Sequence, residues 1–374
     1  MLEKGKINAG EFLILVTVFT IGSAILVAPA PVAKAAKQDA WITAILTTLI
    51  SLFFIFIFNK VSALYPSMTY VDGNEKIYGK WVGKIASILY LFYVFFITCG
   101  QVRDIGDFFT TEILVETPLQ MIMIIFVLTC LIGVRLGLEV ICRSVVIFFP
   151  WIVMLLFILF LFLIPQIKME NIQPIFGEGL KPILKGSYVN WGNPLQLGIL
   201  FMVMPYVTNK TEMKKSFYKG FLIGAVVITI LITLSILVLG ANLTARQSYP
   251  SYMLGKKIAI GTFIQRVEVI VAIIWMLTLY FKTTICYYAL SLGLAQVLGL
   301  KSYKILTFPL AFLIIPFSIF MSPNIIIIHQ FILTALTPYS LTICVFLPLL
   351  LLVIGKVKKH LASKATKKPV NRIN

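Results

Sequence analysis

The sequence predicts an all-α integral membrane protein of ten transmembrane helices, arranged as two inverted five-helix repeats with discontinuous helices 1 and 6. Three observations predict this fold class: the composition, the spacing of apolar runs, and two interruptions at corresponding places in the two halves. Apolar residues make up 60% of the 374 residues, charged residues only 12%, and the mean hydropathy is +0.99. These values are typical of a bilayer protein and exclude an ordinary soluble globular chain.

The apolar runs set the number of helices. A helix needs roughly 20 mostly apolar residues to cross the hydrocarbon core. Runs of this length predict ten spans, near residues 9–33, 40–59, 85–111, 118–134, 144–165, 187–208, 216–240, 264–297, 305–321 and 333–355. A secretory signal peptide at the start is the weaker interpretation, because the first apolar run extends from Phe12 to Val32, longer than a signal core.

The positive charges set the orientation. With Met1 in the cytoplasm, the inner segments hold 21 of the 32 Lys and Arg residues and the outer segments hold 9. This bias places both termini in the cytoplasm. A single transmembrane domain is expected over 1–355, with repeats near 9–165 and 187–355, and a disordered basic cytoplasmic tail over 356–374. The net charge of +18 indicates contact with anionic lipid, whereas nothing in the pattern favours nucleic-acid binding.

Two interruptions predict the binding site. Gly22, Ser23 and Ala24 lie at mid-depth in span one and are followed by two prolines, and span six carries Pro194, Gly198 and Pro205. Backbone leaves helical geometry inside a membrane only where it faces protein or a cavity, because lipid cannot satisfy its hydrogen bonds. Paired interruptions at the heads of two five-span halves predict inverted repeats around a site near the bilayer midplane. Close packing of helices through small residues is the alternative.

Two cations fall inside predicted spans. Arg103 and Asp107 are four residues apart and share a helix face, so an ion pair can offset the cost of burial; lining an entry path is the alternative. Asp104 points elsewhere and needs another partner. Lys282 has no acidic residue three or four positions away. It can pair with a ligand carboxylate, contact carbonyls of a broken helix, carry a proton, or snorkel to the inner interface.

Catalysis has no support in the sequence. The two histidines lie far apart, and the five cysteines fall within or at the edge of spans without metal-ligand spacing. We therefore expect neither an enzyme nor a metal or cofactor site.

Several short motifs, in order, carry a resemblance over nearly the whole chain. They are Ile21-Gly22-Ser23-Ala24-Ile25-Leu26-Val27-Ala28-Pro29, Asp39-Ala40-Trp41-Ile42, Tyr65-Pro66-Ser67, Gly79-Lys80-Trp81-Val82-Gly83, Glu116-Thr117-Pro118-Leu119-Gln120, Pro174-Ile175-Phe176-Gly177-Glu178-Gly179 and Arg266-Val267-Glu268. With this order and length, the chain resembles the B-subunit permeases of endospore germinant receptors, in the amino acid–polyamine–organocation transporter superfamily.

The resemblance implies a nutrient-sensing role in the inner spore membrane, beside an A-type membrane subunit and a C-type lipoprotein. It also implies a small germinant, such as an amino acid, held between helices 1, 3, 6 and 8. The lysine at position 282 departs from the small polar or aromatic residues usual in that stretch of helix 8. A proton-coupled amino acid transporter is the alternative function. The candidate ligand-binding residues are Gly22, Ser23, Ala24, Tyr93, Ile97, Gly198, Leu200, Phe201, Lys282 and Cys286.

Overall fold

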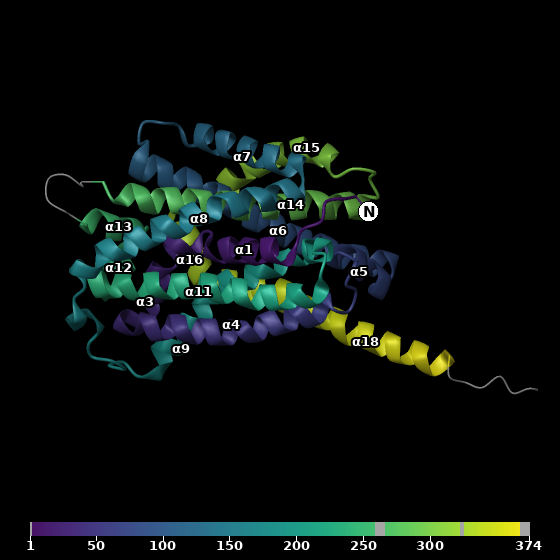
Figure 1. Cartoon of the computed structure of the whole chain (residues 1–374), viewed down its shortest axis with the longest axis horizontal. Helices are drawn as coiled ribbons and strands as arrows, with labels where there is room; N and C mark the ends of the chain where they lie inside the picture. The colour runs from purple at the N-terminus through teal and green to yellow at the C-terminus, as the bar shows by residue number, and fades with distance from the viewer. Residues whose placement is uncertain (1, 259–265, 322–324, 367–374) are drawn as a thin grey trace, which may run out of the picture.

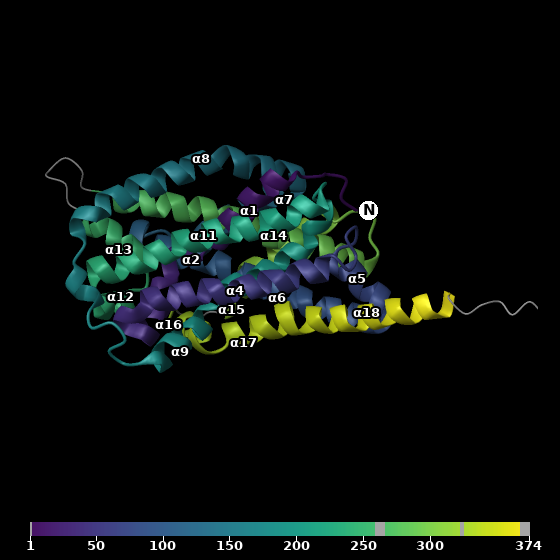
Figure 2. The same ribbon diagram turned by 60° about the horizontal axis from the view of Figure 1, so that its bottom comes forward.

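The structure is a bundle of long helices that run roughly side by side (Figures 1 and 2). It is a computed structural model that describes residues 2–258, 266–321 and 325–366. Over these residues the regular structure is helical, apart from one isolated parallel bridge between Ile7 and Val207. The first helix α1 (Ala9–Ile21) lies inside the bundle, and the N-terminus and the end of α18 (Leu347–Thr366) lie at the same end of the molecule.

Nine helical segments in the described part of the chain are long and apolar enough to cross a membrane. The helices of the first half are α1, α4 (Ala40–Ser62), α6 (Lys80–Phe108), α7 (Leu119–Leu136) and α8 (Leu138–Leu163). Those of the second half are α11 (Lys210–Leu239), α14 (Glu268–Leu298), α15 (Lys304–Met321) and the segment 336–361. The predicted sixth span is not among the nine, because it is built from short helical pieces, and the count of ten stays a prediction.

The first helix is interrupted where the glycine lies. α1 ends at Ile21, Gly22 takes a φ of +22°, and the short helix α2 (Ala24–Val27) follows. A positive φ is unfavourable for residues with a Cβ atom, which explains why a glycine stands here. Pro29 then begins α3 (Pro29–Ala36) at its first turn, where the missing N–H costs no hydrogen bond.

The sixth segment is divided into four pieces. α9 (Leu180–Asn190) and α10 (Gly192–Leu195) are followed by two tighter 3₁₀ turns, Gln196–Met202 and Met204–Tyr206. Pro194 and Pro205 lack the N–H that a continuous helix requires. The discontinuity of helices 1 and 6 is therefore confirmed, although Gly198 lies inside a 3₁₀ turn with no positive φ.

The C-terminal part of the chain contains more helix than the apolar runs predict. The connection between predicted spans nine and ten contains the helix α16 (Ile325–Thr334), which precedes α17 (Leu336–Leu341) and a π turn over Thr342–Phe346. The tail predicted as disordered from Lys356 continues as helix to Thr366 in α18. Residues 367–374, and residues 264 and 265 at the start of predicted span eight, lie outside the described residues.

Helix contacts between the halves follow a reciprocal pattern. α1 packs along α11, α9 packs along α4, and α6 packs along α14. In chain order these are spans one with seven, six with two, and three with eight. Exchanging the two halves turns the pair of spans one and seven into the pair six and two, and it leaves the pair three and eight unchanged. This is the packing that two structurally equivalent five-span halves produce.

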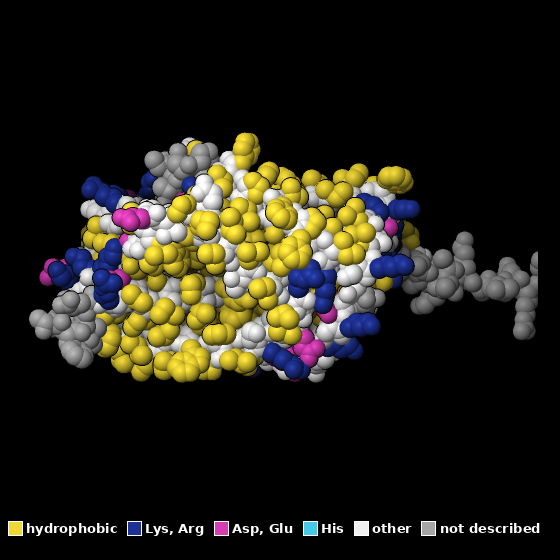
Figure 3. All heavy atoms as spheres, turned by 90° about the horizontal axis from the view of Figure 1, so that it is seen from above, with side chains coloured by type: hydrophobic (Ala, Val, Ile, Leu, Met, Phe, Trp, Pro, Cys, Tyr) yellow, Lys and Arg dark blue, Asp and Glu magenta, His cyan; other side chains and the backbone are white. Residues whose placement is uncertain are grey.

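The surface shows where the membrane lies. In Figure 3 a broad belt of hydrophobic side chains covers the middle of the molecule, and Lys and Arg side chains gather at its two ends. Exposed apolar side chains such as Phe53, Phe92, Phe157 and Phe312 contribute to such a belt. Such exposure is expected in a bilayer, because apolar side chains that contact lipid tails carry no hydrophobic penalty. The chain is therefore a multi-pass integral membrane protein.

Candidate functional site

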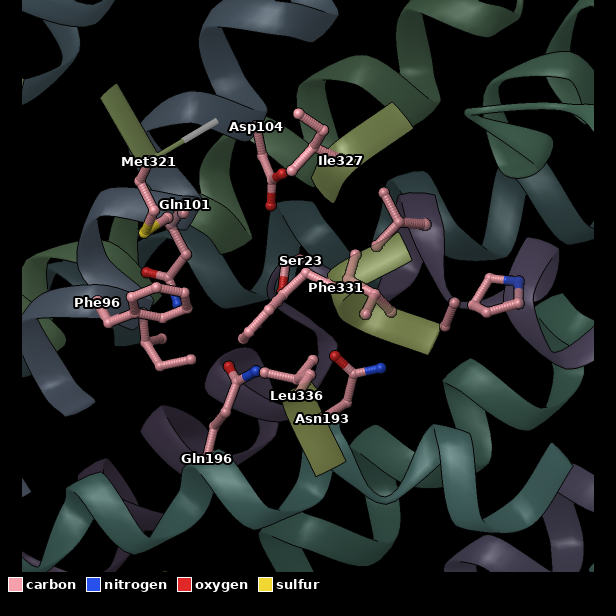
Figure 4. A pocket seen from close by; sticks show the side chains of 16 residues that line it. Ser23, Phe96, Gln101, Asp104, Asn193, Gln196, Met321, Ile327, Phe331 and Leu336 are labelled. Carbon is pink, nitrogen blue, oxygen red and sulfur yellow. The ribbon is translucent and has the colours of Figure 1, made fainter. Parts of the chain in front are cut away.

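A cavity of about 300 Å³ lies where the two interrupted segments meet (Figure 4). Its walls come from the α1–α2 break, α6, α10 with the following turn, and the end of α15 with α16 and α17. Most of the lining is apolar, with Phe96, Met321 and Phe331 among the larger side chains. Five polar side chains interrupt it, which are Ser23, Gln101, Asp104, Asn193 and Gln196. A mostly apolar pocket with a few convergent polar groups is typical of a small-molecule site.

The break in the first helix brings a lysine to the edge of the cavity. Lys282 on α14 is only 1% exposed, and its Nζ donates a hydrogen bond to Ser23 Oγ at 3.0 Å. The same ammonium lies 5.3 Å from the centre of the Phe19 ring. Thr278, one turn earlier on α14, donates from its hydroxyl to the carbonyl of Gly22 at 3.3 Å. α14 thus fills the gap that the helix break leaves, and Ser23 stands between Lys282 and the cavity.

One face of α6 supplies the opposite charge. Ile97, Gln101 and Asp104 follow one another at spacings of four and three residues, so they share a helix face, and all three line the cavity. Figure 4 shows the Asp104 carboxylate directed into this space. Arg103 does not face the cavity, because its Nε binds both carboxylate oxygens of Asp107 at 2.9 and 3.0 Å.

The sixth segment contributes two amides. Gln196 begins the 3₁₀ turn and Asn193 lies in α10, and Figure 4 shows both side chains at the cavity. Asn193 Nδ2 donates to Asn190 Oδ1 at 3.4 Å. The Oε1 atoms of Gln196 and Gln101 are buried without a hydrogen-bond donor in the described structure. Buried acceptors without a donor are uncommon in folded proteins.

The side of the cavity nearer the N-terminus is closed. Tyr90 on α6 donates its hydroxyl to the carbonyls of Gly198 and Ile199 at 3.1 and 3.2 Å. Nearer the N-terminus, the amide of Ile7 donates to Tyr206 O and the amide of Thr208 donates to Ile7 O, at 3.1 and 3.0 Å. These bonds join the start of the chain and the third helix to the sixth segment.

Positive charge lines the approach from the other end. A smaller cavity of about 70 Å³ shares Val27, Pro31 and Ile332 with the main one. Lys34 and Arg246 are among its lining residues. A ligand that carries a carboxylate would meet this positive potential before it reaches the main cavity.

Comparison with known proteins assigns the family. The family model Spore_permease, described as spore germination protein, matches residues 6–326. The chain belongs to this family of spore germination proteins. Among its relatives in Bacillus subtilis, spore germination protein KB is 23% identical over 330 residues, which cover 86% of this chain and 87% of the relative. Spore germination protein YndE is 27% identical over 306 residues, covering 79% and 82%.

Solved structures show that this spore germination family member has a transporter fold. A nucleobase-cation-symport-1 family transporter with bromovinylhydantoin bound matches with a TM-score of 0.68 at 11% identity, covering 91% of this chain and 78% of that one. The transporter MhsT in complex with L-phenylalanine matches with a TM-score of 0.66 at 13% identity, covering 94% and 99%. At such identities the likeness establishes the fold alone.

The structure distributes the ten candidate ligand-binding residues over four places. Ser23 and Ile97 line the cavity, and Gly22, Lys282 and Cys286 lie directly behind it, since Lys282 binds Ser23 and Cys286 contacts Gln101. Ala24 lines a small neighbouring cavity of about 30 Å³. The remaining four pack in the core away from the main cavity, and they are Tyr93, Gly198, Leu200 and Phe201.

The four core residues have other partners. Tyr93 is fully buried, and its hydroxyl lies 2.9 Å from Ser340 Oγ. Phe201 packs against the rings of Phe58 and Tyr70. A Cβ atom at Gly198 would lie 2.8 Å from Cys344 Cβ. This glycine therefore allows close packing, which was the alternative to a role in the binding site.

Sequence reasoning missed the amides Gln101, Asn193 and Gln196 and gave Asp104 no partner. A signal for Gln101 and Asp104 was present, because they share a helical face with Ile97 in a span that is otherwise strongly apolar. No comparable signal pointed to Phe331, which lines the cavity from a helix that lies mostly between predicted spans nine and ten.

Proposed function

We propose that this chain is the B subunit of an endospore germinant receptor, and that it binds a small nutrient, an amino acid, in the cavity between the two interrupted helices. Binding would shift the α1–α2 break and α16 relative to α6, and partner subunits of the A and C types would receive this change. The observation that carries the proposal is the cavity itself, which joins both helix interruptions and has a mostly apolar lining with five polar side chains.

The proposed location is the inner spore membrane, with both termini in the cytoplasm. The excess of Lys and Arg in the segments on the side of the N-terminus and α18 supports this orientation. With that orientation the closed side of the cavity faces the cytoplasm, and the Lys34 and Arg246 side faces outward. A nutrient would then enter from the side on which germinants arrive.

The proposal can be tested in spores whose sole germinant receptor contains this chain. Ile97→Trp places a large ring in the cavity wall, whereas Ile88→Trp makes the same change on an exposed, lipid-facing position of α6. We expect the first variant to abolish nutrient-triggered germination at normal protein levels and the second to respond as the unaltered receptor does. A normal response from Ile97→Trp would remove the ligand from this cavity.

A proton-coupled amino acid transporter is the second candidate function. The buried Lys282 at the break of the first helix, within a transporter fold, favours it, because a buried lysine can carry a proton. Uptake of labelled amino acids into vesicles that contain only this chain separates the two functions. Saturable accumulation driven by a pH gradient would establish transport, and its absence alongside germination activity would support the receptor.

A further inference from the structure

Lysines from two distant parts of the sequence meet at one tyrosine ring. The Nζ atom of Lys76, in α5 (Tyr70–Tyr78), lies 5.0 Å from the centre of the Tyr65 ring, and the Nζ atom of Lys359, in α18, lies 5.2 Å from the same centre. An ammonium within about 6 Å of an aromatic centre is attracted to the ring. Among the described residues no carboxylate forms an ion pair with either lysine, and this includes Asp72 and Glu75 of α5. Two positive charges are therefore held at one ring without an anion.

Contacts of α18 with the ends of α4 and α5 hold its lysines in place. Lys359 Nζ donates to the carbonyl of Leu64 at 3.0 Å, and Lys358 Nζ donates to the carbonyl of Ile77 at 2.5 Å. A Cβ atom at Gly355 would lie 2.5 Å from Leu64 Cδ2, so the glycine allows α18 to approach this closely. A lysine ammonium has three N–H donors. Lys359 uses one of them on Leu64 and keeps the others for an anion, and its side chain loses little freedom when the anion binds.

Apolar surface leads from the membrane belt to these lysines. Phe56 on α4 is 46% exposed, and Val353 and Val357 on α18 are 55% and 53% exposed. α18 packs along α4, and Figure 1 places α5 and the end of α18 at the same end of the molecule. Val357 precedes Lys359 by two residues, which is about 3 Å of helix rise. The lysines therefore lie where the apolar belt ends, at the depth of the lipid headgroups.

The charge around the ring is positive overall. α18 contains four lysines and no acidic residue, whereas α5 contains two acidic residues and one lysine. One of those acidic residues is already engaged, because the Asp72 carboxylate accepts from Gln296 Nε2 at 3.0 Å. Basic pockets between helices at the membrane surface are suited to anionic headgroups.

We infer that Lys76, Lys359 and Tyr65 form a binding site for the phosphate group of an anionic phospholipid. A phosphodiester carries one negative charge and several acceptor oxygens, so each ammonium group can donate to a different oxygen. The acyl chains then lie on the exposed apolar side chains of α4 and α18. A zwitterionic lipid brings its own cation next to the phosphate, which both lysines repel, so the site favours phosphatidylglycerol over phosphatidylcholine. None of the three residues lines the main cavity, and the inference is independent of the proposed function.

Native mass spectrometry of the delipidated full-length chain in detergent tests the site. The probes are palmitoyl-oleoyl phosphatidylglycerol, palmitoyl-oleoyl phosphatidylcholine and inorganic phosphate. We expect the first phosphatidylglycerol to bind on the order of tenfold more tightly than phosphatidylcholine, and the difference to shrink as the salt concentration rises. Inorganic phosphate has the same acceptor oxygens but no acyl chains, so an equal concentration of it should not displace the lipid.

A double variant and its matched control locate the lipid. Lys76→Gln combined with Lys359→Gln should weaken binding of phosphatidylglycerol on the order of tenfold to thirtyfold, the range expected for two lysines at an anionic surface, and leave phosphatidylcholine unchanged. Lys214→Gln combined with Lys219→Gln removes the same charge from two exposed lysines of α11 and should leave both affinities unchanged. Lys76→Arg combined with Lys359→Arg keeps both charges and should bind as the unaltered chain does.

Several outcomes would overturn the inference. Equal affinity for phosphatidylglycerol in the glutamine double variant and in the α11 control would place the lipid elsewhere. Equal affinity of the unaltered chain for the two lipids would show that the lysines do not select charge. Displacement of the lipid by an equal concentration of inorganic phosphate would assign the site to a soluble anion. None of these results bears on the main cavity, whose role Ile97→Trp tests separately.

Discussion

Replacing Gly22 with alanine should both destabilise the chain and weaken its response to ligand. The backbone at Gly22 has a φ of +22°, and a Cβ atom there would lie 2.4 Å from Lys282 Cδ and 2.9 Å from the carbonyl oxygen of Phe19. Carbon atoms in ordinary contact are about 3.5–4.0 Å apart. Alanine therefore forces the lysine out of its position and strains the helix break at the same time.

The size of the effect follows from these two terms. A left-handed backbone costs a residue with a Cβ atom roughly 1–2 kcal/mol. Displacing Lys282 removes its hydrogen bond to Ser23, which is worth about 1.5–3 kcal/mol for a charged donor. We expect the free energy of unfolding to fall by about 2.5–5 kcal/mol, and the ligand dose–response to move to higher concentration because Ser23 loses its support.

The assay compares Gly22→Ala with Gly73→Ala. Gly73 lies in α5 (Tyr70–Tyr78), outside the cavity, and a Cβ atom there meets no atom within 4 Å. Alanine in that helix should be neutral or stabilise the chain by up to about 1 kcal/mol. Denaturation in detergent micelles measures the unfolding free energies, and spore germination measures the dose–response. Equal values for the two variants would refute the account of the helix break.

Three further predictions concern charges outside the cavity. Arg103→Met should lower the free energy of unfolding by about 3–5 kcal/mol, because it leaves Asp107 buried without its guanidinium, and the double variant with Asp107→Leu should recover most of that loss in the same denaturation measurement. Glu178→Gln should change it by less than about 1 kcal/mol, because the ion pair with Lys37 is exposed. Asp72 in α5 is an exposed residue, but partial desolvation of its carboxyl raises the pKa of that group. The charged form therefore opposes folding, so Asp72→Asn should stabilise the chain near pH 7, and a pH series of melts should show that gain vanish below about pH 4, where the unfolded carboxyl is also protonated.

The apolar runs predicted the nine helical segments in the described part of the chain that are long and apolar enough to cross a membrane, because a membrane-spanning helix must be mostly apolar. The break at Gly22 was predicted from the glycine itself and the two prolines that follow it, which indicate irregular backbone. The apolar runs did not predict α16, whose apolar residues Ile325 to Ile328 form a run too short for a span. The extent of α18 was also missed, since charged residues in a solvated helix resemble those of a disordered tail.

Within the site, sequence determined which residues were unusual, and tertiary structure decided what they contact. Lys282 was conspicuous because a lysine inside an apolar span has no local partner, yet only the crossing of α14 with the α1–α2 break brings it to Ser23, a residue 259 positions away. Asp104 on α6 lines the same cavity as Ser23. Hydropathy and charge spacing are properties of one helix and can be read along the chain. A cavity depends on the relative placement of helices that are far apart in sequence, which is fixed only when their side chains pack together.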